Sequence, residues 1–519
     1  MIDGTQESNS EMSDNDDYNF DAELSVMKGK ARQRAFDVEA ESLSVQDIEA
    51  IMKRDAEHVS GIFGAPVSIA YLLLRYQTWN KEKLIERYMD DPSKVLATAG
   101  VLDPSTENLA SPLMPPSSRR VTRGTTSTRS RQSQPSPPPF MCPICCDDEP
   151  PNIMSLGCGH MYCSNCWDTY LHTKIREEGE LSIRCMDELC AIQADQTFIR
   201  KVVSNQDLQR YHELLVRDYV TNNPQLRFCP HPGCAYALSC AAASTKSALQ
   251  TIVPTVRCAE KHAFCFGCAL EGGHAPVICT VSKLWLKKCA DDSETANWIK
   301  SNTKECTNCN STIEKNGGCN HMTCKKCKNE FCWVCMGSWA EHGTSWYSCN
   351  RYDEKDGVDA RDIQSKSRAS LERYLHYYNR WANHEQSARL SLDLYAKTEK
   401  KMEEMQITSN LTWIEVQFAK KAVDEVIKCR KTLKWTYAMA FYLESGNAKQ
   451  LFEDNQADLE KAVEDLSELL ESPIEPETIP ILRQKMTDKT VYVAKRNDIV
   501  LEDTAKGFVD GRWIWNIGM

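Results

Sequence analysis

The clustering of cysteines constrains this chain more than any other feature of its sequence. Of its 25 cysteines, 24 lie between Cys142 and Cys349, and only Cys429 lies outside that stretch. Most of them form Cys-x2-Cys pairs with histidines nearby. In a reducing compartment this pattern is typical of structural zinc, whereas disulfides are typical of secreted proteins. Because nothing in the sequence marks a secreted chain, we predict zinc sites rather than disulfides.

Charge and hydropathy exclude several classes of protein. No run approaches the roughly 18 consecutive apolar residues that would span a bilayer. Residues 1–24 carry eight acids and no base, unlike a secretory signal or a transit peptide. The net charge of −11 argues against a nucleic-acid-binding protein, which normally carries a basic footprint. We therefore expect no membrane and no nucleic acid among the partners.

Residues before the first cysteine divide into three segments. Residues 1–40 are polar and acidic, which predicts disorder. Helical spacing and capping residues predict three short helices over 41–101, the first of them beginning after Ser44. Residues 102–140 are rich in Pro, Ser and Arg, which predicts a flexible tether; alternatively, its arginines contact a phosphate or an acidic partner.

The part of the chain after the cysteines, residues 351–508, has the pattern of a helical bundle. Apolar residues recur at helical spacing in four segments, near 361–405, 411–445, 448–472 and 477–507. We expect their aromatic residues to form a core, with Cys429 as a small buried hydrophobe. Residues 509–519 are expected to form a tail.

The first cysteine cluster supplies the eight ligands that two tetrahedral zinc ions need. Its seven cysteines, with one histidine in fourth place, follow the RING pattern, in which the two sites interleave. One ion is then held by Cys142, Cys145, Cys163 and Cys166, and the other by Cys158, His160, Cys185 and Cys190. No position is left open for catalytic metal chemistry, and Cys146 is surplus.

The second cluster is one ligand short of two complete sites. Its seven clear ligands are Cys229, Cys234, Cys258, Cys265, Cys268, His274 and Cys279. His262 and Glu260 are both chemically possible as the eighth. We favour His262, because imidazole is the commoner structural zinc ligand.

The third cluster has one ligand too many. Two complete sites can be built from Cys306, Cys309, Cys324 and Cys327, and from Cys332, Cys335, His342 and Cys349. Cys319 is then left over, after two glycines that leave the backbone open to another chain and two residues before His321. A free thiol near an imidazole suits nucleophilic catalysis through a thioester. The alternative is that Cys319 is a ligand and another cysteine is spare.

Three consecutive zinc modules, of which the last has a surplus cysteine, resemble the RING-between-RING (RBR) ubiquitin ligases. The helical segments are similar to those of the Ariadne subgroup, and the resemblance spans residues 44 to about 507. The matching stretches are Trp79–Leu84, Glu314–Met322, Phe331–Cys335, Trp346–Tyr352, Lys401–Met405, Trp413–Phe418 and Asn455–Glu460.

The resemblance implies an E3 ubiquitin-protein transferase with a catalytic cysteine. A ubiquitin-conjugating enzyme would dock on the first RING near Ile144 and pass its thioester-linked ubiquitin to Cys319. A lysine of a protein substrate would then attack this second thioester, with His321 as the general base and Glu330 as its acidic support. Chemistry agrees, because an ammonium must lose its proton before it attacks.

The resemblance also implies a multidomain α+β fold in which three zinc-stapled modules lie between a ubiquitin-associated (UBA)-like bundle and an all-α Ariadne domain. Helical linkers join the modules. The expected bounds are a first RING at 141–195, a linker at 196–225, an in-between-RING module at 226–282, a linker at 283–303 and a catalytic RING at 304–350. About six structural zinc ions follow, two for each module.

In this family the Ariadne domain folds over the catalytic cysteine. We therefore expect autoinhibition that is relieved by a neddylated cullin-RING ligase, in the cytoplasm or also in the nucleus. Two other classes of protein fit the cysteines less well. A zinc-scaffolded adaptor would have no use for an unligated Cys319, and a nucleic-acid binder would need a basic face, whereas residues 142–349 carry near-balanced charge.

Overall fold

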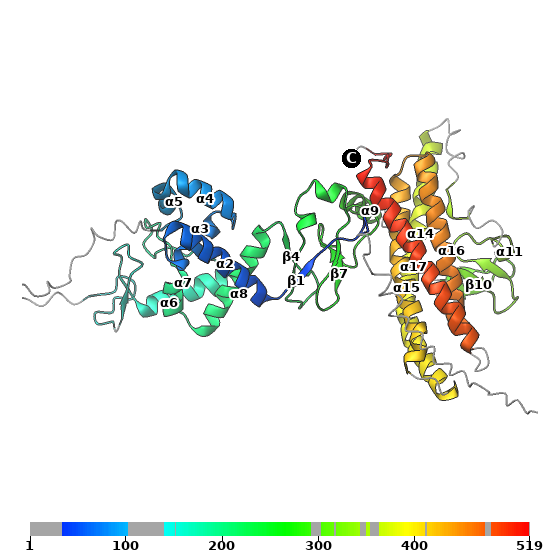
Figure 1. The fold of residues 1–519 in the computed structure, drawn as a ribbon, viewed down its shortest axis with the longest axis horizontal. Helices are drawn as coiled ribbons and strands as arrows, with labels where there is room; N and C mark the ends of the chain where they lie inside the picture. Colours follow the sequence, from blue (N-terminus) through cyan, green and yellow to red (C-terminus); the bar gives the residue numbers. More distant parts are fainter. Residues whose placement is uncertain are drawn as a thin grey trace, which may run out of the picture.

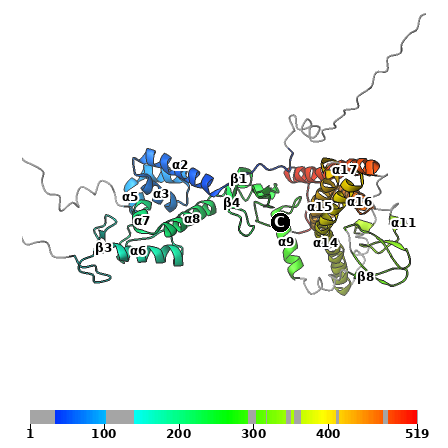
Figure 2. The same ribbon diagram turned by 90° about the horizontal axis from the view of Figure 1, so that it is seen from below.

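The computed structural model describes residues 34–101, 140–150, 152–291, 303–315, 318–342, 349–352, 363–409, 413–472 and 479–517. Most of the segment expected to be disordered (1–40), most of the expected tether (102–140), and residues 316–317 and 346–348 of the matching stretches lie outside them. The expectation of disorder is wrong for residues 34–40, because Arg34 and Ala35 contact the last long helix and Val38 packs on the middle module. The described parts form an elongated molecule (Figure 1). The N-terminal helices and the first zinc module lie at one end, the middle module lies at the centre, and the C-terminal helices with the third module lie at the other end (Figures 1 and 2).

The N-terminal bundle has one helix more than its sequence pattern predicts. The helices are α2 (Val45–Phe63), α3 (Val67–Tyr76), α4 (Lys81–Asp90) and α5 (Pro92–Thr98). The prediction that α2 begins after Ser44 is confirmed, because Ser44 and Asp47 form a reciprocal capping box. The helix α4 ends at Asp90, and Pro92 then begins the additional helix α5, since the first helical position needs no N–H donor.

The N-terminal bundle, the first zinc module and the helices that follow it share one apolar core. The module contains β2 (Ile153–Met154), β3 (Tyr162–Cys163) and α6 (Ser164–His172), which continues into the π-helical turn η2 (Thr173–Glu178). The following helices are α7 (Gln196–Val202) and α8 (Asn205–Asn222). Trp79 donates from Nε1 to Asp218 of α8 at 2.7 Å. These elements therefore form one body at the N-terminal end.

The middle module is built on a three-stranded antiparallel sheet in the order β1-β5-β4. The strands β4 (Leu226–Phe228) and β5 (Ala237–Ser239) belong to the module, whereas β1 (Glu41–Leu43) precedes the N-terminal bundle in the chain. Ser42 pairs with Leu238 in the register of β1 with β5. The hairpin of β6 (Thr255–Arg257) and β7 (Ala263–Cys265) and the short helices η3 (Ala241–Ala243) and η4 (Ala248–Gln250) complete the module. The sequence pattern did not predict the strand β1.

The third module consists of two hairpins and a short helix. Its elements are β8 (Thr303–Glu305), β9 (Thr312–Glu314), β10 (His321–Thr323), β11 (Glu330–Cys332) and α11 (Trp339–His342). It lies against the C-terminal helices (Figures 1 and 2).

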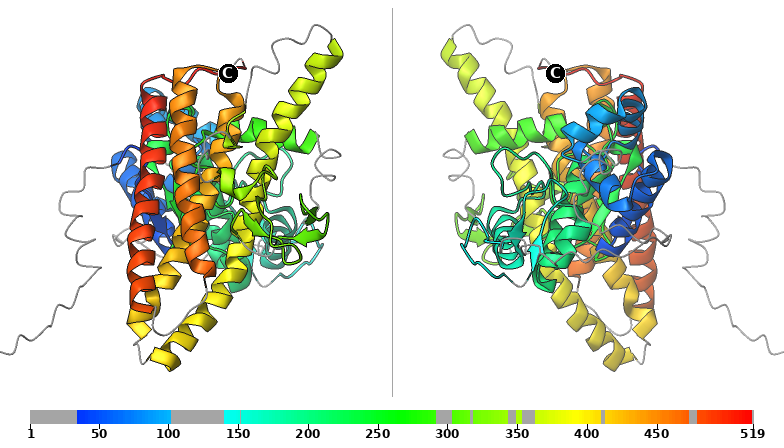
Figure 3. Two further views of the ribbon diagram at one scale, coloured as in Figure 1. Left: turned by 90° about the vertical axis from the view of Figure 1, so that its right-hand side faces the viewer. Right: turned by 90° about the vertical axis from the view of Figure 1, so that its left-hand side faces the viewer.

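Four long helices form the C-terminal domain, and they lie where the helical spacing predicts them (Figure 3). They are α14 (Ile363–Ser409), α15 (Trp413–Tyr442), α16 (Asn447–Glu471) and α17 (Ile479–Val509). Cys429 is fully buried in their core, as predicted. The predicted multidomain fold, with zinc modules between two helical domains, is confirmed.

Two further contacts extend the C-terminal domain. The helix α9 (Cys279–Asp291) of the middle module packs on it through Trp285, which lies in an aromatic core with Trp435 and Tyr442. The segment expected to be a tail folds back, since Trp513 donates from Nε1 to the Thr504 carbonyl at 3.0 Å. In the part of the chain that the structure describes, no single helix is long and apolar enough to cross a membrane.

Candidate functional site

The predicted zinc ligands come together in compact groups of four. In five groups the ligand atoms all lie within 4.8 Å of one another: Cys142, Cys145, Cys163 and Cys166; Cys158, His160, Cys185 and Cys190; Cys229, Cys234, Cys258 and His262; Cys265, Cys268, His274 and Cys279; Cys306, Cys309, Cys324 and Cys327. In the sixth predicted set, Cys335 Sγ lies 3.9 Å from His342 Nε2, and Cys332 contacts Cys335 and Cys349. Four thiol or imidazole donors per group, with no carboxylate among them, fit zinc in a closed structural site.

A recurrent turn forms five of the six Cys-x2-Cys pairs, and the sixth, Cys163 and Cys166, lies at the start of α6. In five pairs the backbone N–H of the residue after the second cysteine donates to the carbonyl of the first, at 2.8 to 2.9 Å. These five residues adopt the left-handed conformation that L-residues avoid, with φ between 52° and 61°: Cys146, Ala269, Asn310, Lys328 and Met336. Cys146 is surplus to its zinc group because it occupies this turn position.

His262 is the fourth donor in the first group of the middle module. Its Nδ1 atom lies 3.4 Å from Cys258 Sγ and 3.7 Å from Cys229 Sγ. The alternative residue, Glu260, places its Oε2 atom 3.9 Å from the same ring nitrogen and takes no place in the group. The geometry therefore favours the imidazole, as the chemical argument from the sequence does.

Cys319 is not needed by either zinc group of the third module, and it lies beside two other predicted site residues. The backbone N–H of His321 donates to Cys319 Sγ at 3.4 Å. Across the β10–β11 hairpin, Glu330 Oε2 lies 3.5 Å from His321 Nε2. The indole of Trp339 stacks on the His321 ring, with centroids 4.2 Å apart and planes 6° apart. An imidazole with a fixed plane thus lies near a carboxylate across this hairpin, and the Cys319 thiol directly precedes it in the chain.

The C-terminal domain covers this thiol, which is only 5% exposed. Asn320, the next residue, donates from its backbone N to Glu464 Oε2 at 2.7 Å and from Nδ2 to Glu464 Oε1 at 2.9 Å. Arg430 of α15 donates to the same carboxylate at 2.6 Å. Glu464 on α16 therefore accepts hydrogen bonds from both sides of the boundary.

A second contact beside Cys319 joins the third module to α14. The Lys315 ammonium is buried and donates to Asn320 Oδ1 at 2.9 Å, to Asn383 Oδ1 at 2.8 Å and to Ser387 Oγ at 3.0 Å. Burial lowers the pKa of Lys315 to about 8, and the positive charge of Arg430 acts in the same direction. Three oxygen acceptors offset part of the cost of burying this cation.

Burial also changes the chemistry of the covered cysteine. Loss of solvent raises the pKa of the Cys319 thiol well above its ordinary value, and the negative charge of Glu464 acts in the same direction. The thiolate is the nucleophilic form of cysteine. In this conformation Cys319 is therefore both inaccessible and held as a neutral thiol.

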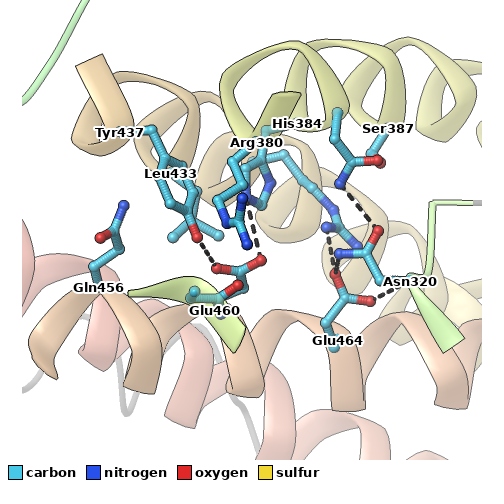
Figure 4. A network of polar contacts seen from close by, with 12 residues as sticks. Asn320, Arg380, His384, Ser387, Leu433, Tyr437, Gln456, Glu460 and Glu464 are labelled. Carbon is cyan, nitrogen blue, oxygen red and sulfur yellow. Dashed lines mark hydrogen bonds and ion pairs between the residues drawn. The ribbon is translucent and has the colours of Figure 1, made fainter. Parts of the chain in front are cut away.

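One helical turn from Glu464, a second carboxylate extends the polar network. Glu460 accepts a short hydrogen bond from the Tyr437 hydroxyl and lies 3.5 Å from His384 Nε2 (Figure 4). Arg380 of α14 donates to the backbone carbonyl of Cys349, which belongs to the last zinc group. The third module thus contacts α14 at two places, through Lys315 and through the backbone of Cys349.

The predicted contact residue for a conjugating enzyme is on the surface. Ile144 lies between two zinc ligands of the first module and is 51% exposed. Sequence reasoning missed Lys315, Asn320, Arg430 and Glu464. A usable signal was present, because Arg430 and Glu464 are charged residues next to the apolar residues Cys429 and Val463, where a plain core helix would carry none.

His262→Ala is expected to lower the zinc content by at least one ion per chain, because its middle-module group would lose one of four ligands. Glu260→Gln is the control and should leave the zinc content unchanged. Elemental analysis of the purified full-length variants measures this. Full zinc content in His262→Ala, or loss of zinc in Glu260→Gln, would contradict the ligand assignment.

Comparison with protein-family models matches each part of the chain in order. The matches are the UBA-like domain of E3 ubiquitin-protein ligase ARIH1 at residues 50–90, a C3HC4-type RING finger at 142–187, the IBR half RING-finger domain at 209–279, a second IBR domain at 301–350 and the Ariadne domain at 372–487.

Curated relatives match over almost the whole length. E3 ubiquitin-protein ligase dbl4 of Schizosaccharomyces pombe is 48% identical over 484 residues, which cover 93% of this chain and 90% of that protein. E3 ubiquitin-protein ligase ariadne-1 of Drosophila melanogaster is 41% identical, with 99% and 97% covered. Human E3 ubiquitin-protein ligase ARIH1 is 41% identical, with 92% and 82% covered. On this similarity, together with its zinc groups and its helical domains, the chain belongs to the Ariadne-type RING-between-RING E3 ubiquitin-protein ligases.

Proposed function

We propose that this ligase passes ubiquitin to its substrates in two covalent steps through Cys319. In the first step the Cys319 thiolate attacks the thioester that joins ubiquitin to a conjugating enzyme docked near Ile144. The new carbon–sulfur bond replaces the old one, and the conjugating enzyme leaves as its thiolate. The observation that carries this proposal is a cysteine outside the zinc groups that contacts the backbone of His321, whose ring lies 3.5 Å from the Glu330 carboxylate.

In the second step a lysine of the protein substrate attacks the Cys319 thioester. Lysine has an ordinary pKa of about 10.4, so near neutral pH its amine is almost fully protonated and a base must take a proton. His321 is the proposed base, and the carboxylate of Glu330 stabilises the imidazolium that forms. An amide bond forms, Cys319 leaves as a thiolate, and the stacked Trp339 keeps the His321 ring in one plane.

We infer that the C-terminal domain inhibits this reaction in the closed conformation. The support is the burial of Cys319, the raised pKa of its thiol and the hydrogen bonds of Glu464 to Asn320. An activator must bind the open state more tightly than the closed state, since only differential affinity shifts such an equilibrium. The proposed activator is a neddylated cullin-RING ligase, with the N-terminal bundle as its docking element. Zinc held by reduced thiols fits the cytoplasmic location that we propose.

Cys319→Ala should abolish transfer and leave the zinc content and fold unchanged, because a nucleophile carries no structural bond. Cys324→Ala should instead lose metal and destabilise the third module, since metal binding and folding are coupled in such small domains. Ubiquitin transfer assays and elemental analysis of both variants measure this. Release of zinc by Cys319→Ala would show that Cys319 is a ligand.

His321→Ala should still accept ubiquitin onto Cys319 but should discharge it to lysine about 100-fold more slowly, a typical loss for a general base. The defect should shrink as pH rises, because more of the attacking amine is then unprotonated. Separate single-turnover measurements of thioester formation and of discharge make this test. An equal loss in both steps would instead indicate a structural role for the ring.

Glu464→Ala should raise autoubiquitination of the full-length chain by about tenfold or more, because hydrogen bonds to a charged group contribute about 1.5–3 kcal/mol each. Glu468→Ala, an exposed carboxylate one turn further along α16, is the matched control and should change little. Initial rates with a charged conjugating enzyme measure the effect. No gain in Glu464→Ala, with zinc content intact, would rule out inhibition by this contact.

A further inference from the structure

Residues 34–43, named here the N-terminal strap, contact three separate parts of the molecule. The strap leads into α2 of the N-terminal bundle, passes along the middle module as β1, and reaches α17 of the C-terminal domain (Figure 1). Among the described residues it is a second connection between the two ends of the elongated molecule, besides the middle module and its helix α9. Neither the zinc chemistry nor the transfer reaction needs it.

The first contact of the strap is polar and lies on α17. Arg34 Nη1 lies 2.5 Å from Asp498 Oδ2, and the backbone N–H of Ala35 donates to Glu502 Oε2 at 2.7 Å. A cavity of about 400 Å³ lies between this part of the strap and α17. The contact is therefore held by charge and hydrogen bonds rather than by close packing. Such a contact can be broken and remade.

The second contact of the strap lies on the middle module. Val38 packs against the apolar core of the module. Residues 41–43 pair with the free side of β5, and the hydroxyl of Ser42 accepts a hydrogen bond from the Ala259 N–H at 3.0 Å. The strap thereby covers an otherwise exposed sheet edge.

The third contact of the strap lies on the N-terminal bundle, and the chain between the three contacts is short. Leu43 is buried in the N-terminal core, and Ser44 caps α2 directly afterwards. Only five residues separate Ala35 from β1, and a strand extends by about 3.3 Å per residue. A displacement of the N-terminal bundle by more than a few residue lengths must therefore pull the strap off β5 or off α17.

We propose that the N-terminal strap is a tether that helps to hold the C-terminal domain closed and releases it when the N-terminal bundle is displaced. This proposal rests on the autoinhibition proposed above and adds a physical route from the bundle to α17. Coupling of this kind is reciprocal, so opening of the C-terminal domain also favours a free strap. Exposed ion pairs and hydrogen bonds are weak, so we expect the α17 contact to change the closed-to-open ratio by only about two- to fivefold.

The test compares full-length variants of α17 in single-turnover transfer of ubiquitin from a charged conjugating enzyme to Cys319. Asp498→Asn combined with Glu502→Gln should accelerate transfer by about two- to fivefold. Asp488→Asn, compared with Asp498→Asn alone, removes the same single charge from an exposed position of the same helix and should leave the rate unchanged. Equal acceleration in this control would overturn the proposal, because it would indicate a general charge effect.

A charge exchange and a background variant separate the strap from other causes. Arg34→Asp should accelerate transfer, and Arg34→Asp combined with Asp498→Arg should restore the slow rate. In a Glu464→Ala chain, which is already open, the strap variants should give no further gain. If Glu464→Ala accelerates transfer but the strap variants do not, the tether is wrong and the autoinhibition stands. If Glu464→Ala also fails to accelerate transfer, the proposed autoinhibition itself is wrong.

Discussion

The burial of one carboxylate, Glu464, organises the closed conformation of this ligase. An isolated charge is costly to bury, and it is tolerated when it is paired and hydrogen-bonded. Glu464 meets this condition here because Arg430 from its own domain and Asn320 from the third zinc module both donate to it. Asn320, which supplies two of the hydrogen bonds to Glu464, directly follows Cys319 in the chain. Satisfying the carboxylate therefore also covers the thiol, and this links the fold of the C-terminal domain to the chemistry of the site.

Zinc allows a small module to hold a cysteine outside its metal groups, next to the asparagine that donates to this carboxylate. The third module is too small to build a large apolar core, and its ligand groups fix the backbone instead. Its Cys-x2-Cys turns place a residue such as Asn310 or Lys328 in a left-handed conformation, a local strain that metal binding offsets. Because eight other ligands complete the two groups, the Cys319 thiol is spare. A cysteine that binds zinc could not accept ubiquitin from a conjugating enzyme and pass it to a lysine without losing its metal and unfolding the module.

The local parts of this account follow from the sequence, whereas the contacts between domains do not. Ligand spacing predicts the zinc groups, and helical spacing locates the four long helices, because both depend on residues near one another in the chain. The strand β1 pairs with residues almost 200 positions later, and its three residues carry no pattern that names a partner. Asn320 and Glu464 are 144 residues apart, and their meeting depends on how whole domains pack. A charged residue beside an apolar helical stripe indicates that another residue pairs with the charge, but it does not indicate which residue that is.

The central claim is that ubiquitin is carried on Cys319 during transfer. The most direct measurement mixes a charged conjugating enzyme with the Glu464→Ala chain, stops the reaction early and maps the modified peptide by mass spectrometry. The account predicts ubiquitin on Cys319, through a bond that excess thiol or hydroxide cleaves. Ubiquitin that passes directly from the conjugating enzyme to lysine, with no adduct on Cys319 at any time, would contradict it.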